Sequence, residues 1–438
     1  MSFPKYPAYK DSGVEWIGEI PVGWKYCRLR FVAQFNPSKS EISYIPLNEE
    51  VSFLPMDAIG DDGAINLEQK RKISDVQNGY TYFRDMDVVF AKITPCFENG
   101  KGALVKGLLR GIGFGTTELI VARATQSRVI PEYLHSFFQS DIFRKPAEAS
   151  MYGAGGQKRV SEPFVRDFSI PLPPLPEQQA IASFLDRECE KIDALIAEQE
   201  RLIALLAEKR QAVISHAVTK GLNPNAPMKD SGIPWIGMVP EGWEVKCLRY
   251  VCDFEQGKAH EPFFDDDGEF ICATARFVST SGSSFKRCNT CLTKAEKRDI
   301  LMVMSDLPNG RALARAFLVT ENNIAINQRI CKIVPRIGNE CFYYYQLDRN
   351  QGLLKYDDKV NQTHLSNNAY KALPLIVPPL EEQNRIASYL QTFDEENVRL
   401  NQELLGSLIL LKERRAALIS AAVTGKIDVR AQSKALAA

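Results

Sequence analysis

Residues 173–185 read PPLPEQQAIASFL, and residues 378–390 repeat this stretch as PPLEEQNRIASYL. The correspondence continues without a gap to RQAVISHAVT at 210–219 and RAALISAAVT at 415–424. Each copy begins with prolines and with acidic or amide residues, which favour a helix start, and ends near Gly221 or Gly425, where helices commonly stop. The pattern predicts two matched helices of about 40 residues, each roughly 60 Å long at about 1.5 Å per residue.

The apolar residues of both copies recur every seven positions, which indicates that the two helices pack on each other as a coiled coil. One polar position interrupts each row, Gln199 in the first copy and Asn397 in the second, a common device for fixing the register. A two-fold relation between the repeats requires the helices to run antiparallel. The alternative is that each amphipathic helix packs only on its own domain. The predicted seam consists of Leu185, Ile192, Leu195, Leu202, Leu206 and Val213 in the first helix and Leu390, Phe393, Leu400, Leu404, Leu411 and Leu418 in the second.

A second repeat precedes each variable stretch. Residues 10–32 return without a gap as residues 229–251, and the shared pattern SGxxWIGxxPxGW contains all four tryptophans, Trp16, Trp24, Trp235 and Trp243. Because this frame is duplicated and the inserts are not, we expect buried tryptophans that pack each domain against the helices. An aromatic ligand-binding patch is the alternative.

The stretches between the repeats share no obvious sequence, and both have the composition of mixed helix and strand. The predicted fold class is α+β, with two α/β domains separated by two long antiparallel coiled-coil helices and an internal pseudo-two-fold repeat. The expected boundaries are 1–172, 173–222, 223–377 and 378–438. Strands are expected at 87–93, 117–122, 270–273, 300–304 and 324–334, and helices at 131–143 and 341–354.

Composition excludes several classes of protein. No apolar run approaches the roughly 20 residues of a membrane span, and the N-terminus lacks an apolar signal core, so we expect a cytosolic protein. The ten cysteines are scattered, and the C-x-x-C of Cys288 and Cys291 has no second pair to complete a zinc site, so we expect no metal. There is no phosphate loop, amino-methyltransferase tetrapeptide, or protease or kinase signature, which indicates a chain without catalytic residues.

Two loops, each just before a proline-rich helix start, contain hydrogen-bond donors suited to phosphates and base edges. The net charge of zero argues against DNA binding unless the basic residues cluster on one face or partner subunits supply the grip. For each candidate outside these two loops, an ordinary surface role is an equal alternative. The first-domain candidates are Lys92, Lys101, Lys106, Arg110, Gly153, Gly155, Gly156, Gln157, Lys158 and Arg159. The second-domain candidates are Asn309, Arg311, Arg315, Asn327, Gln328, Arg329, Lys359, Asn361, Gln362 and His364.

These motifs closely resemble the specificity subunit of type I restriction–modification systems, over essentially the whole chain. The resemblance rests on the two SGxxWIGxxPxGW copies, on GAGGQKRVSEPFVRDFSIPLPPLPEQ at 153–178, on PPLEEQNRIASYL at 378–390, and on the two helix ends. Met1 and the complete second helix lead us to expect a full-length subunit.

The resemblance implies a non-catalytic subunit in which each of two domains reads one half of an asymmetric, bipartite sequence in double-stranded DNA. It further implies that the helices set the unread gap and dock two methylation subunits, which use S-adenosylmethionine to methylate adenine at N6. It also implies two restriction (motor) subunits that use ATP and Mg²⁺. No cofactor is expected in this chain itself.

Three alternatives stay open on the residues alone. The chain could be a methyltransferase or nuclease with its own active site, although the missing motifs count against this. It could be a helical scaffold that binds only proteins. It could also be an alternate specificity subunit that pairs with methylation subunits and never with a motor subunit.

Overall fold

The computed structural model describes residues 3–307, 312–357 and 360–430. The chain divides into two compact units. The first unit comprises Met1–Arg201 and Leu404–Ala438, and the second unit comprises Leu202–Glu403. Each unit therefore contains one variable domain and the adjoining parts of both long helices. None of the helices in the described residues is both long and apolar enough to cross a membrane.

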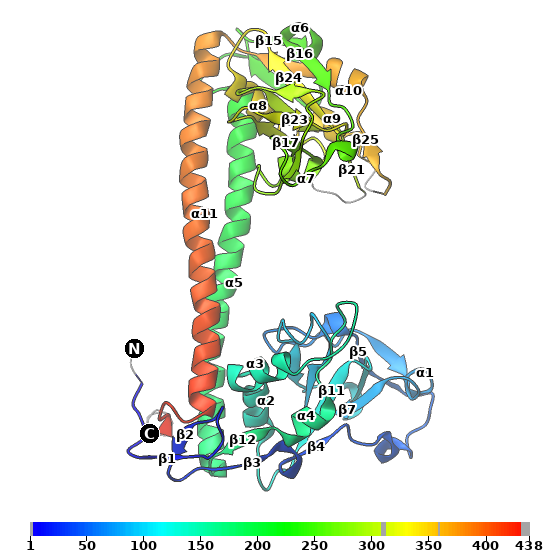
Figure 1. Cartoon of the computed structure of the whole chain (residues 1–438), viewed down its shortest axis with the longest axis vertical. Coiled ribbons are helices and arrows are strands. Elements are labelled where there is room, and N and C mark those ends of the chain that lie inside the picture. Colours follow the sequence, from blue (N-terminus) through cyan, green and yellow to red (C-terminus); the bar gives the residue numbers. More distant parts are fainter. Residues whose placement is uncertain (1–2, 308–311, 358–359, 431–438) are drawn as a thin grey trace. The chain divides into compact units, whose positions relative to one another are not determined.

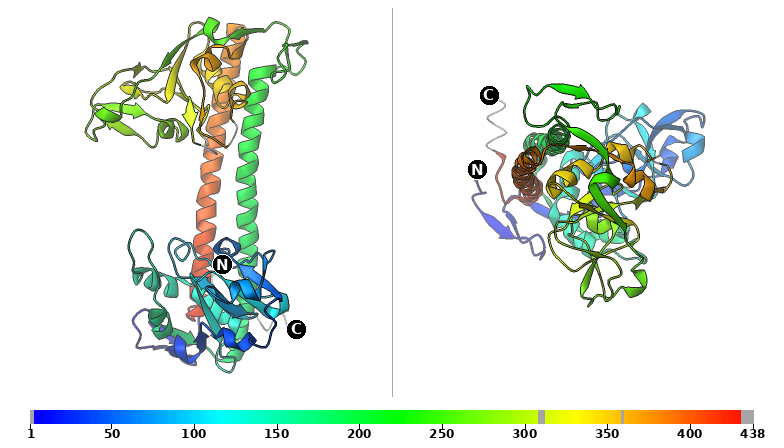
Figure 2. Two further views of the ribbon diagram at one scale, coloured as in Figure 1. Left: turned by 90° about the vertical axis from the view of Figure 1, so that its right-hand side faces the viewer. Right: turned by 90° about the horizontal axis from the view of Figure 1, so that it is seen from above.

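The two predicted helices are present as α5 (Leu175–Lys220, 46 residues) and α11 (Leu380–Val423, 44 residues), each without a break (Figures 1 and 2). In the first unit Glu200 of α5 lies 3.5 Å from Lys412 of α11, and Asp193 of α5 lies 2.8 Å from Arg415 of α11. A step back along α5 is therefore a step forward along α11. In the second unit Arg210 binds Asp394 through two 2.8 Å hydrogen bonds. Further along α5, residues 214–218 share a core with residues 386–390. The helices are antiparallel within each unit, as predicted.

The flanking row of the predicted seam needs correction at three of its residues. The row that contains Gln199 and Asn397 is buried or half-buried along its length, and Phe393 is half-buried. The flanking residues Leu195, Leu202 and Leu400 are 54%, 41% and 43% exposed, so their assignment to the seam is wrong. The second row of the seam lies four residues after the first row and not three. Both flanks carry apolar residues, so hydrophobicity alone could not choose between them. The second row consists of Ile196, Ile203 and Arg210 in α5 and Asp394, Asn401, Leu408 and Arg415 in α11.

The variable domain of the first unit contains two four-stranded sheets. In the first sheet β5 and β10 are parallel and the other neighbours antiparallel. All neighbours in the second sheet are antiparallel. The first sheet has the order β6 (Lys70–Lys72), β5 (Glu50–Leu54), β10 (Ile112–Gly115), β7 (Thr81–Arg84). The second has the order β4 (Ala33–Phe35), β11 (Leu119–Ala124), β8 (Asp87–Ala91), β9 (Gly102–Leu104).

The second unit repeats this topology although the two inserts share no obvious sequence. Its first sheet again contains one parallel pair, β17 with β23, and its second sheet is again antiparallel throughout. The variable stretches are therefore two versions of one fold. The first sheet has the order β18 (Lys286–Cys288), β17 (Phe270–Ala273), β23 (Ile324–Ile326), β19 (Lys294–Ala295). The second has the order β16 (Cys252–Gln256), β24 (Ile330–Pro335), β20 (Ile300–Val303), β22 (Ala316–Leu318).

Two-stranded sheets repeat as well, and they join each domain to its helix start. In the first unit they are β1 (Tyr9–Asp11) with β2 (Glu19–Pro21), and β3 (Lys25–Arg28) with β12 (Ser169–Leu172). In the second unit they are β13 (Met228–Asp230) with β14 (Met238–Pro240), and β15 (Glu244–Cys247) with β26 (Pro374–Val377). Thus the fold class expected from the sequence is confirmed, including its internal repeat.

Three predicted single elements are each two elements. The helix expected at 131–143 is α2 (Pro131–Gln139) and α3 (Asp141–Ala149), because Ser140 between them is extended, with ψ of 146°. The helix expected at 341–354 is α8 (Glu340–Leu347) and α9 (Gln351–Leu354). The strand expected at 324–334 is β23 and β24, which a turn at 327–329 separates. Periodicity carried through these short breaks, so the sequence did not reveal them.

The second tryptophan of each frame joins the start of one long helix to the end of the other. Trp24 and Trp243 are both 1% exposed. The indole Nε1 of Trp24 donates to Glu177 at the start of α5 (3.1 Å), and that of Trp243 donates to Glu382 at the start of α11 (2.7 Å). A Cβ added to Gly425, just after α11, would lie 3.3 Å from the Trp24 ring, and one on Gly221 would lie 3.1 Å from the Trp243 ring. The packing role expected for this motif is confirmed at both positions.

The glutamines that follow these glutamates also have a structural role that the helix dipole does not explain. The buried carboxamide of Gln178 donates to the carbonyls of Arg128 and Pro173 and accepts from the N–H of Ile130, all at 2.9 Å. Gln383 makes the equivalent contacts, donating to Pro378 (2.8 Å) and accepting from Asn339 (3.0 Å). The repeated Glu-Gln pair therefore fastens each domain to its helix.

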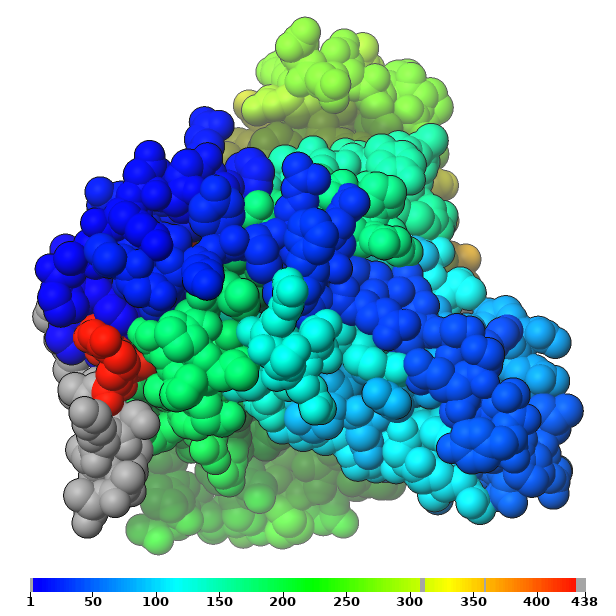
Figure 3. All heavy atoms as spheres, turned by 90° about the horizontal axis from the view of Figure 1, so that it is seen from below, coloured from blue at the N-terminus to red at the C-terminus, as the bar shows by residue number. Residues whose placement is uncertain are grey.

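In the first unit the N-terminal segment packs beside the residues that follow α11. The N–H of Asp428 donates to the carbonyl of Pro4 (2.7 Å), and the hydroxyl of Tyr9 donates to the carbonyl of Gly425 (3.0 Å). Figure 3 shows this contact as the border between the blue N-terminal residues and the red residues after α11.

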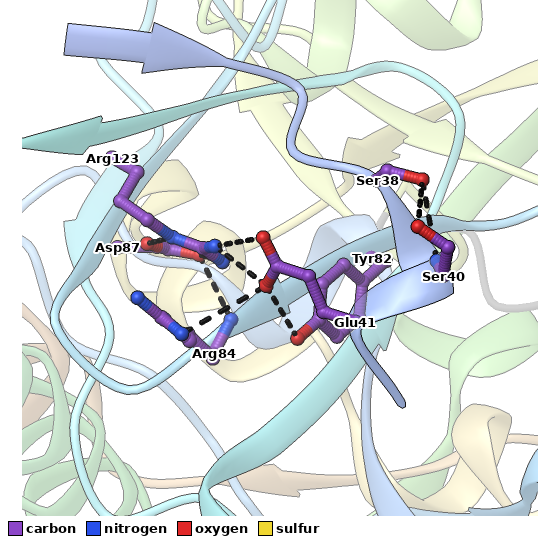
Figure 4. Close-up of polar contacts among 7 residues, drawn as sticks. All are labelled: Ser38, Ser40, Glu41, Tyr82, Arg84, Asp87 and Arg123. Atoms are coloured by element: carbon purple, nitrogen blue, oxygen red, sulfur yellow. Dashed lines mark hydrogen bonds and ion pairs between the residues drawn. The ribbon is translucent and has the colours of Figure 1, made fainter. Parts of the chain in front are cut away.

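An ion cluster with a buried centre, Arg123 and Asp87, ties the two sheets of the first domain together (Figure 4). The guanidinium of Arg123 on β11 donates two 2.7 Å hydrogen bonds to Asp87 on β8. It also donates two, of 2.9 and 2.7 Å, to Glu41 on the short helix η2 (Lys39–Ile42). The hydroxyl of Tyr82, on β7 of the other sheet, donates to Glu41 at 3.3 Å. Every carboxylate in the cluster thus has a cationic partner.

Candidate nucleic-acid interface

The glycine-rich loop 152–160 closes on one edge of the first domain. The N–H of Val160 donates to the carbonyl of Lys92 (2.8 Å), and the N–H of Lys92 donates to the carbonyl of Glu118 (2.9 Å). Ile93 and Arg159 form an isolated antiparallel bridge. The loop thus lies against the extension of β8 and the turn 116–118 between β10 and β11, and two of the predicted elements, Lys92 and the loop, are brought together.

The second domain builds the same arrangement from other residues. The N–H of Leu365 donates to the carbonyl of Met304 (2.7 Å), and the N–H of Met304 donates to the carbonyl of Arg329 (2.9 Å). Two short strands, β21 (Ser305–Asp306) and β25 (Thr363–His364), pair where Ile93 and Arg159 pair in the first domain. The two loops are structural counterparts, as their positions in the sequence indicated.

This equivalence aligns individual residues. Gln157 corresponds to Gln362, so this position is glutamine in both domains. Lys158 corresponds to Thr363, and Arg159 to His364. On the adjoining turn Glu118 corresponds to Arg329. One backbone frame therefore presents different side chains in the two domains.

The first loop needs its glycines for two different reasons. A Cβ on Gly153 would lie 2.3 Å from the carbonyl oxygen of Gln157, which is too close for any side chain. Gly155 and Gly156 have φ of 62° and 78° with open space around them, so they serve the turn itself. Thr94 closes the loop by donating to the carbonyl of Gly156 (2.6 Å). In this loop conformation the side chains of Gln157 and Lys158 are exposed.

Arg159 is occupied within the first domain. Its guanidinium donates to both carboxylate oxygens of Glu118, at 3.0 and 2.8 Å. These hydrogen bonds lower the pKa of Glu118 more than its partial burial raises it. Arg159 therefore braces the loop against the turn, and the donors available to a ligand are those of its neighbours.

In the second domain an exposed cation, Arg329, lies on the turn 327–329. Asn327 is buried and donates to Glu261 (3.2 Å), and Gln328 donates to the same carboxylate oxygen (3.3 Å). Burial alone would raise the pKa of Glu261, but these hydrogen bonds and the charge of Arg329 help to lower it. Arg329 is exposed, and no carboxylate of the described residues lies within 4 Å of it. Asn327 and Gln328 position the turn, and Arg329 is free to contact a ligand.

A cleft of about 510 Å³ opens beside this turn. It brings Asn327 and Arg329 together with three residues that the sequence did not single out, Arg276, Phe285 and Lys286. A signal for them was present, because Phe285, Lys286 and Arg287 place an aromatic residue next to two cations, a combination typical of nucleic-acid surfaces.

Several of the remaining candidates have protein partners. Lys101 donates to the carbonyl of Met56 (2.9 Å), and Lys106 lies 3.4 Å from Glu132. Arg110 pairs with Glu49, and Arg315 lies 3.5 Å from Asp348. Gln362 donates to Ser305 (3.1 Å), and Asn361 and His364 are exposed. Asn309, Arg311 and Lys359 lie outside the described residues.

A family model described as the type I restriction modification DNA specificity domain matches residues 116–203 and 240–408, which is more than half of the chain. The chain belongs to this family. The matched ranges include the loop 152–160 and its counterpart in the second domain, the turns 116–118 and 327–329, and most of both long helices.

Individual relatives agree with this assignment. The chain is 42% identical over 194 residues to the type I restriction enzyme EcoAI specificity subunit of Escherichia coli, covering 44% of this chain and 32% of that protein. The chain thus spans about a third of the length of that relative. It is 24% identical over 445 residues to a putative type I restriction enzyme MjaX specificity subunit of Methanocaldococcus jannaschii, covering 94% and 96% of the two chains.

A solved structure shares the fold of nearly the whole chain. It comes from work described as the structural basis of complex assembly and conformational transition of the type I R-M system, with a TM-score of 0.72 and 18% identity. The match covers 92% of this chain and 98% of that chain. At this level of identity the likeness establishes the fold.

The C-x-x-C pair lies in the second domain of this family member, where Cys288 is the last residue of the edge strand β18. Burial raises the pKa of both thiols, Cys288 and Cys291. Among the described residues no group of three or more His, Cys, Asp or Glu side chains is placed to hold a metal ion.

Proposed function

We propose that this chain is the DNA-recognition subunit of a type I restriction–modification assembly, in which each variable domain reads one half of a two-part DNA sequence. One observation carries the proposal. Two domains with the same topology present unlike side chains from equivalent positions of one backbone frame. Such a pair suits two different half-sites, because the frame sets where the protein touches the duplex and the side chains set which bases it accepts.

The side chains at the two loops have the chemistry that base reading requires. A guanidinium can donate two hydrogen bonds to the O6 and N7 of guanine, and a carboxamide can pair with the N6 and N7 of adenine. Arg329 is the strongest candidate of the first kind and Gln157 of the second, since both are exposed. The exposed side chain of Lys158, next to Gln157, supports a contact with a phosphate or a base. Each good bidentate pair contributes about 1–3 kcal/mol of discrimination.

The long helices have two roles in the proposal. They set the unread gap between the half-sites, which is consistent with the unbroken course of α5 and α11. They also dock two methylation subunits, and apolar side chains that face solvent support this role. The exposed residues include Leu195, Leu202, Leu400, Ile409 and Leu410.

Chemistry belongs to the partners. The methylation subunits bind S-adenosylmethionine, and two motor subunits use ATP and Mg²⁺. This chain contributes sequence recognition and assembly.

The proposal is tested by selecting bound duplexes from a random pool with the full chain and its methylation subunits, followed by sequencing. We expect two conserved blocks separated by an unread gap. Arg329→Ala should relax the preference within one block and weaken binding to the original site about tenfold, as expected from the loss of a bidentate contact of about 1–3 kcal/mol. Gln157→Ala should relax only the other block.

Arg336→Ala is the matched control, because Arg336 lies at the opposite end of β24 from Arg329 and pairs with Asp253 at 2.8 Å. It removes the same charge and should leave both blocks unchanged. Equal relaxation of both blocks by either test variant would contradict the division between domains. Binding without any selected sequence would favour a protein scaffold, and methylation by the chain alone would favour an enzyme.

A further inference from the structure

The two variable domains share a basic outer strand that neither the repeats nor the reading loops include. In the first domain β6 contains Lys70, Arg71 and Lys72, and in the second domain β18 contains Lys286 and Arg287. Both strands form the edge of the first sheet, and both pair antiparallel with the strand that begins the parallel pair. The same element of one fold is thus basic in two sequences that are otherwise unlike.

The register makes the correspondence specific. Ser52 of β5 pairs with Gly113 of the parallel neighbour, as Ile271 of β17 pairs with Ile324. On the opposite side, Ser52 faces Lys70, and Ile271 faces Arg287. A cation therefore occupies the same position on the sheet in both domains.

Three of these five cations, Arg71, Lys286 and Arg287, lie over aromatic rings and not beside carboxylates. The guanidinium of Arg71 lies 3.8 Å from the centre of the Phe53 ring and donates to the Tyr80 hydroxyl (3.2 Å). In the second domain Lys286 lies 4.7 Å from the centre of the Phe264 ring. Arg287 likewise lies 5.7 Å from the centre of the Phe285 ring. Within the described residues no ion pair involves the cations of β6 or β18. An aromatic face orients a cation without neutralising it, so the positive charge stays available.

Both edge strands begin near the end of the sheet that leads into the turns 116–118 and 327–329. In the second domain Lys286 lines the cleft that also contains Asn327 and Arg329. In the first domain the N–H of Phe53 donates to the carbonyl of Gln69, directly before β6 (2.9 Å). This places the start of β6 beside the end of β5, and the neighbouring β10 leads into the turn 116–118. In the second domain the basic strand therefore borders the cleft proposed to read bases, whereas in the first domain β6 begins near that end of the sheet and runs away from it, with Lys72 opposite Glu50.

We propose that β6 and β18 are equivalent phosphate clamps that seat the backbone of double-stranded DNA beside each reading loop, a proposal that rests on the function proposed above. The clamps hold the duplex without reading its sequence. They account for DNA binding by a chain whose formal net charge is zero, because uncompensated cations are concentrated on the same strand of both domains.

A competing explanation is that lysines on an edge strand prevent two sheets from pairing edge to edge. The two explanations differ in what neutral substitutions change. A phosphate clamp controls DNA affinity and its dependence on salt, whereas a guard against pairing controls self-association.

The test uses the full chain with its methylation subunits, a duplex carrying the selected site and a duplex of unrelated sequence. Lys70→Gln with Lys72→Gln, and separately Lys286→Gln with Arg287→Gln, should weaken binding to both duplexes about tenfold at physiological salt. The slope of log affinity against log salt should fall by about 1.8 for two lost phosphate contacts, and the selected bases should not change. Lys70→Arg with Lys72→Arg should retain the wild-type affinity and slope.

Lys5→Gln with Lys10→Gln is the charge-matched control, since both lysines are exposed on the N-terminal segment and it should leave affinity unchanged. The inference is overturned if the edge-strand variants bind like this control, if they alter the selected bases, or if they self-associate while DNA affinity is intact. Failure of the wild-type assembly to select any two-block sequence would instead overturn the proposed function.

Discussion

Trp24→Ala is expected to lower the free energy of unfolding of the first unit by about 3–5 kcal/mol, as is usual when a large buried aromatic side chain is truncated. The side chain is 1% exposed and belongs to a core that contains residues from the start of α5 and the end of α11. Its removal also takes away the indole N–H that donates to Glu177. The Tyr6 hydroxyl still donates to that carboxylate. The loss should appear as a lower midpoint of urea denaturation, followed by circular dichroism.

Trp16→Ala provides the matched control within the same copy of the frame. Trp16 is 45% exposed and packs on Phe168, so its truncation should cost well under half as much. Trp243→Ala should reproduce the large loss in the second unit, because its indole makes the equivalent contact with Glu382. If Trp24→Ala and Trp16→Ala were equally mild, the helix-junction role of the second tryptophan would be wrong.

Arg123→Met should destabilise the first domain by a similar amount, about 3–5 kcal/mol, because removing one partner of a buried ion pair leaves the other charge uncompensated. The stranded group is Asp87, whose side chain is 1% exposed. Arg123→Met combined with Asp87→Asn should recover a large part of the loss, since the buried charge is then gone. Arg84→Met is the control. Arg84 is 53% exposed and 3.8 Å from Glu41, so it should cost less than about 1 kcal/mol.

The same cluster predicts how stability depends on pH. Burial alone would raise the pKa of Glu41, but the hydrogen bonds and charge of Arg123 outweigh it and hold the pKa below its ordinary value of 4.5. A carboxyl group with a lowered pKa stabilises the fold above its ordinary pKa, and this contribution is lost as the pH falls through the lowered value. The wild-type chain should therefore lose more stability between pH 7 and pH 3 than Arg123→Met does. An equal loss in urea titrations at the two pH values would exclude this linkage.

The repeated frame can be read from the amino-acid sequence because its signals are local. Prolines and glycines mark helix ends, and a seven-residue period marks a helix that packs along its length, so the predicted helices agree closely with α5 and α11. The assignment of the tryptophans to buried packing is correct for Trp24 and Trp243, because duplication of a large apolar side chain in a shared frame indicates a shared contact, and wrong for Trp16, which is 45% exposed. The loop counterparts at Gln157 and Gln362 are also found, by their distance from the helix start.

Other features depend on contacts between segments far apart in the chain. The choice between Leu195 and Ile196 as a seam residue is decided by which flank faces the partner helix, and the ion pairs of Arg210 and Arg415 occupy that flank. Glu177 and Gln178 resemble ordinary helix-start residues, and their actual partners are Trp24 and a loop near Ile130.

The sequence by itself determined that two matched long helices carry two unlike inserts, because helical period, capping residues and duplication are properties of neighbouring residues. Only the tertiary structure decided that the unlike inserts share one sheet topology. It also decided that Glu118 and Arg329 occupy equivalent positions on the corresponding turns of the two domains, and that β6 and β18 are equivalent basic edges. The physical reason is that strand pairing is set by hydrogen bonds between distant segments and by burial of either face. Many different side chains satisfy both conditions, so a common fold leaves no common sequence to read.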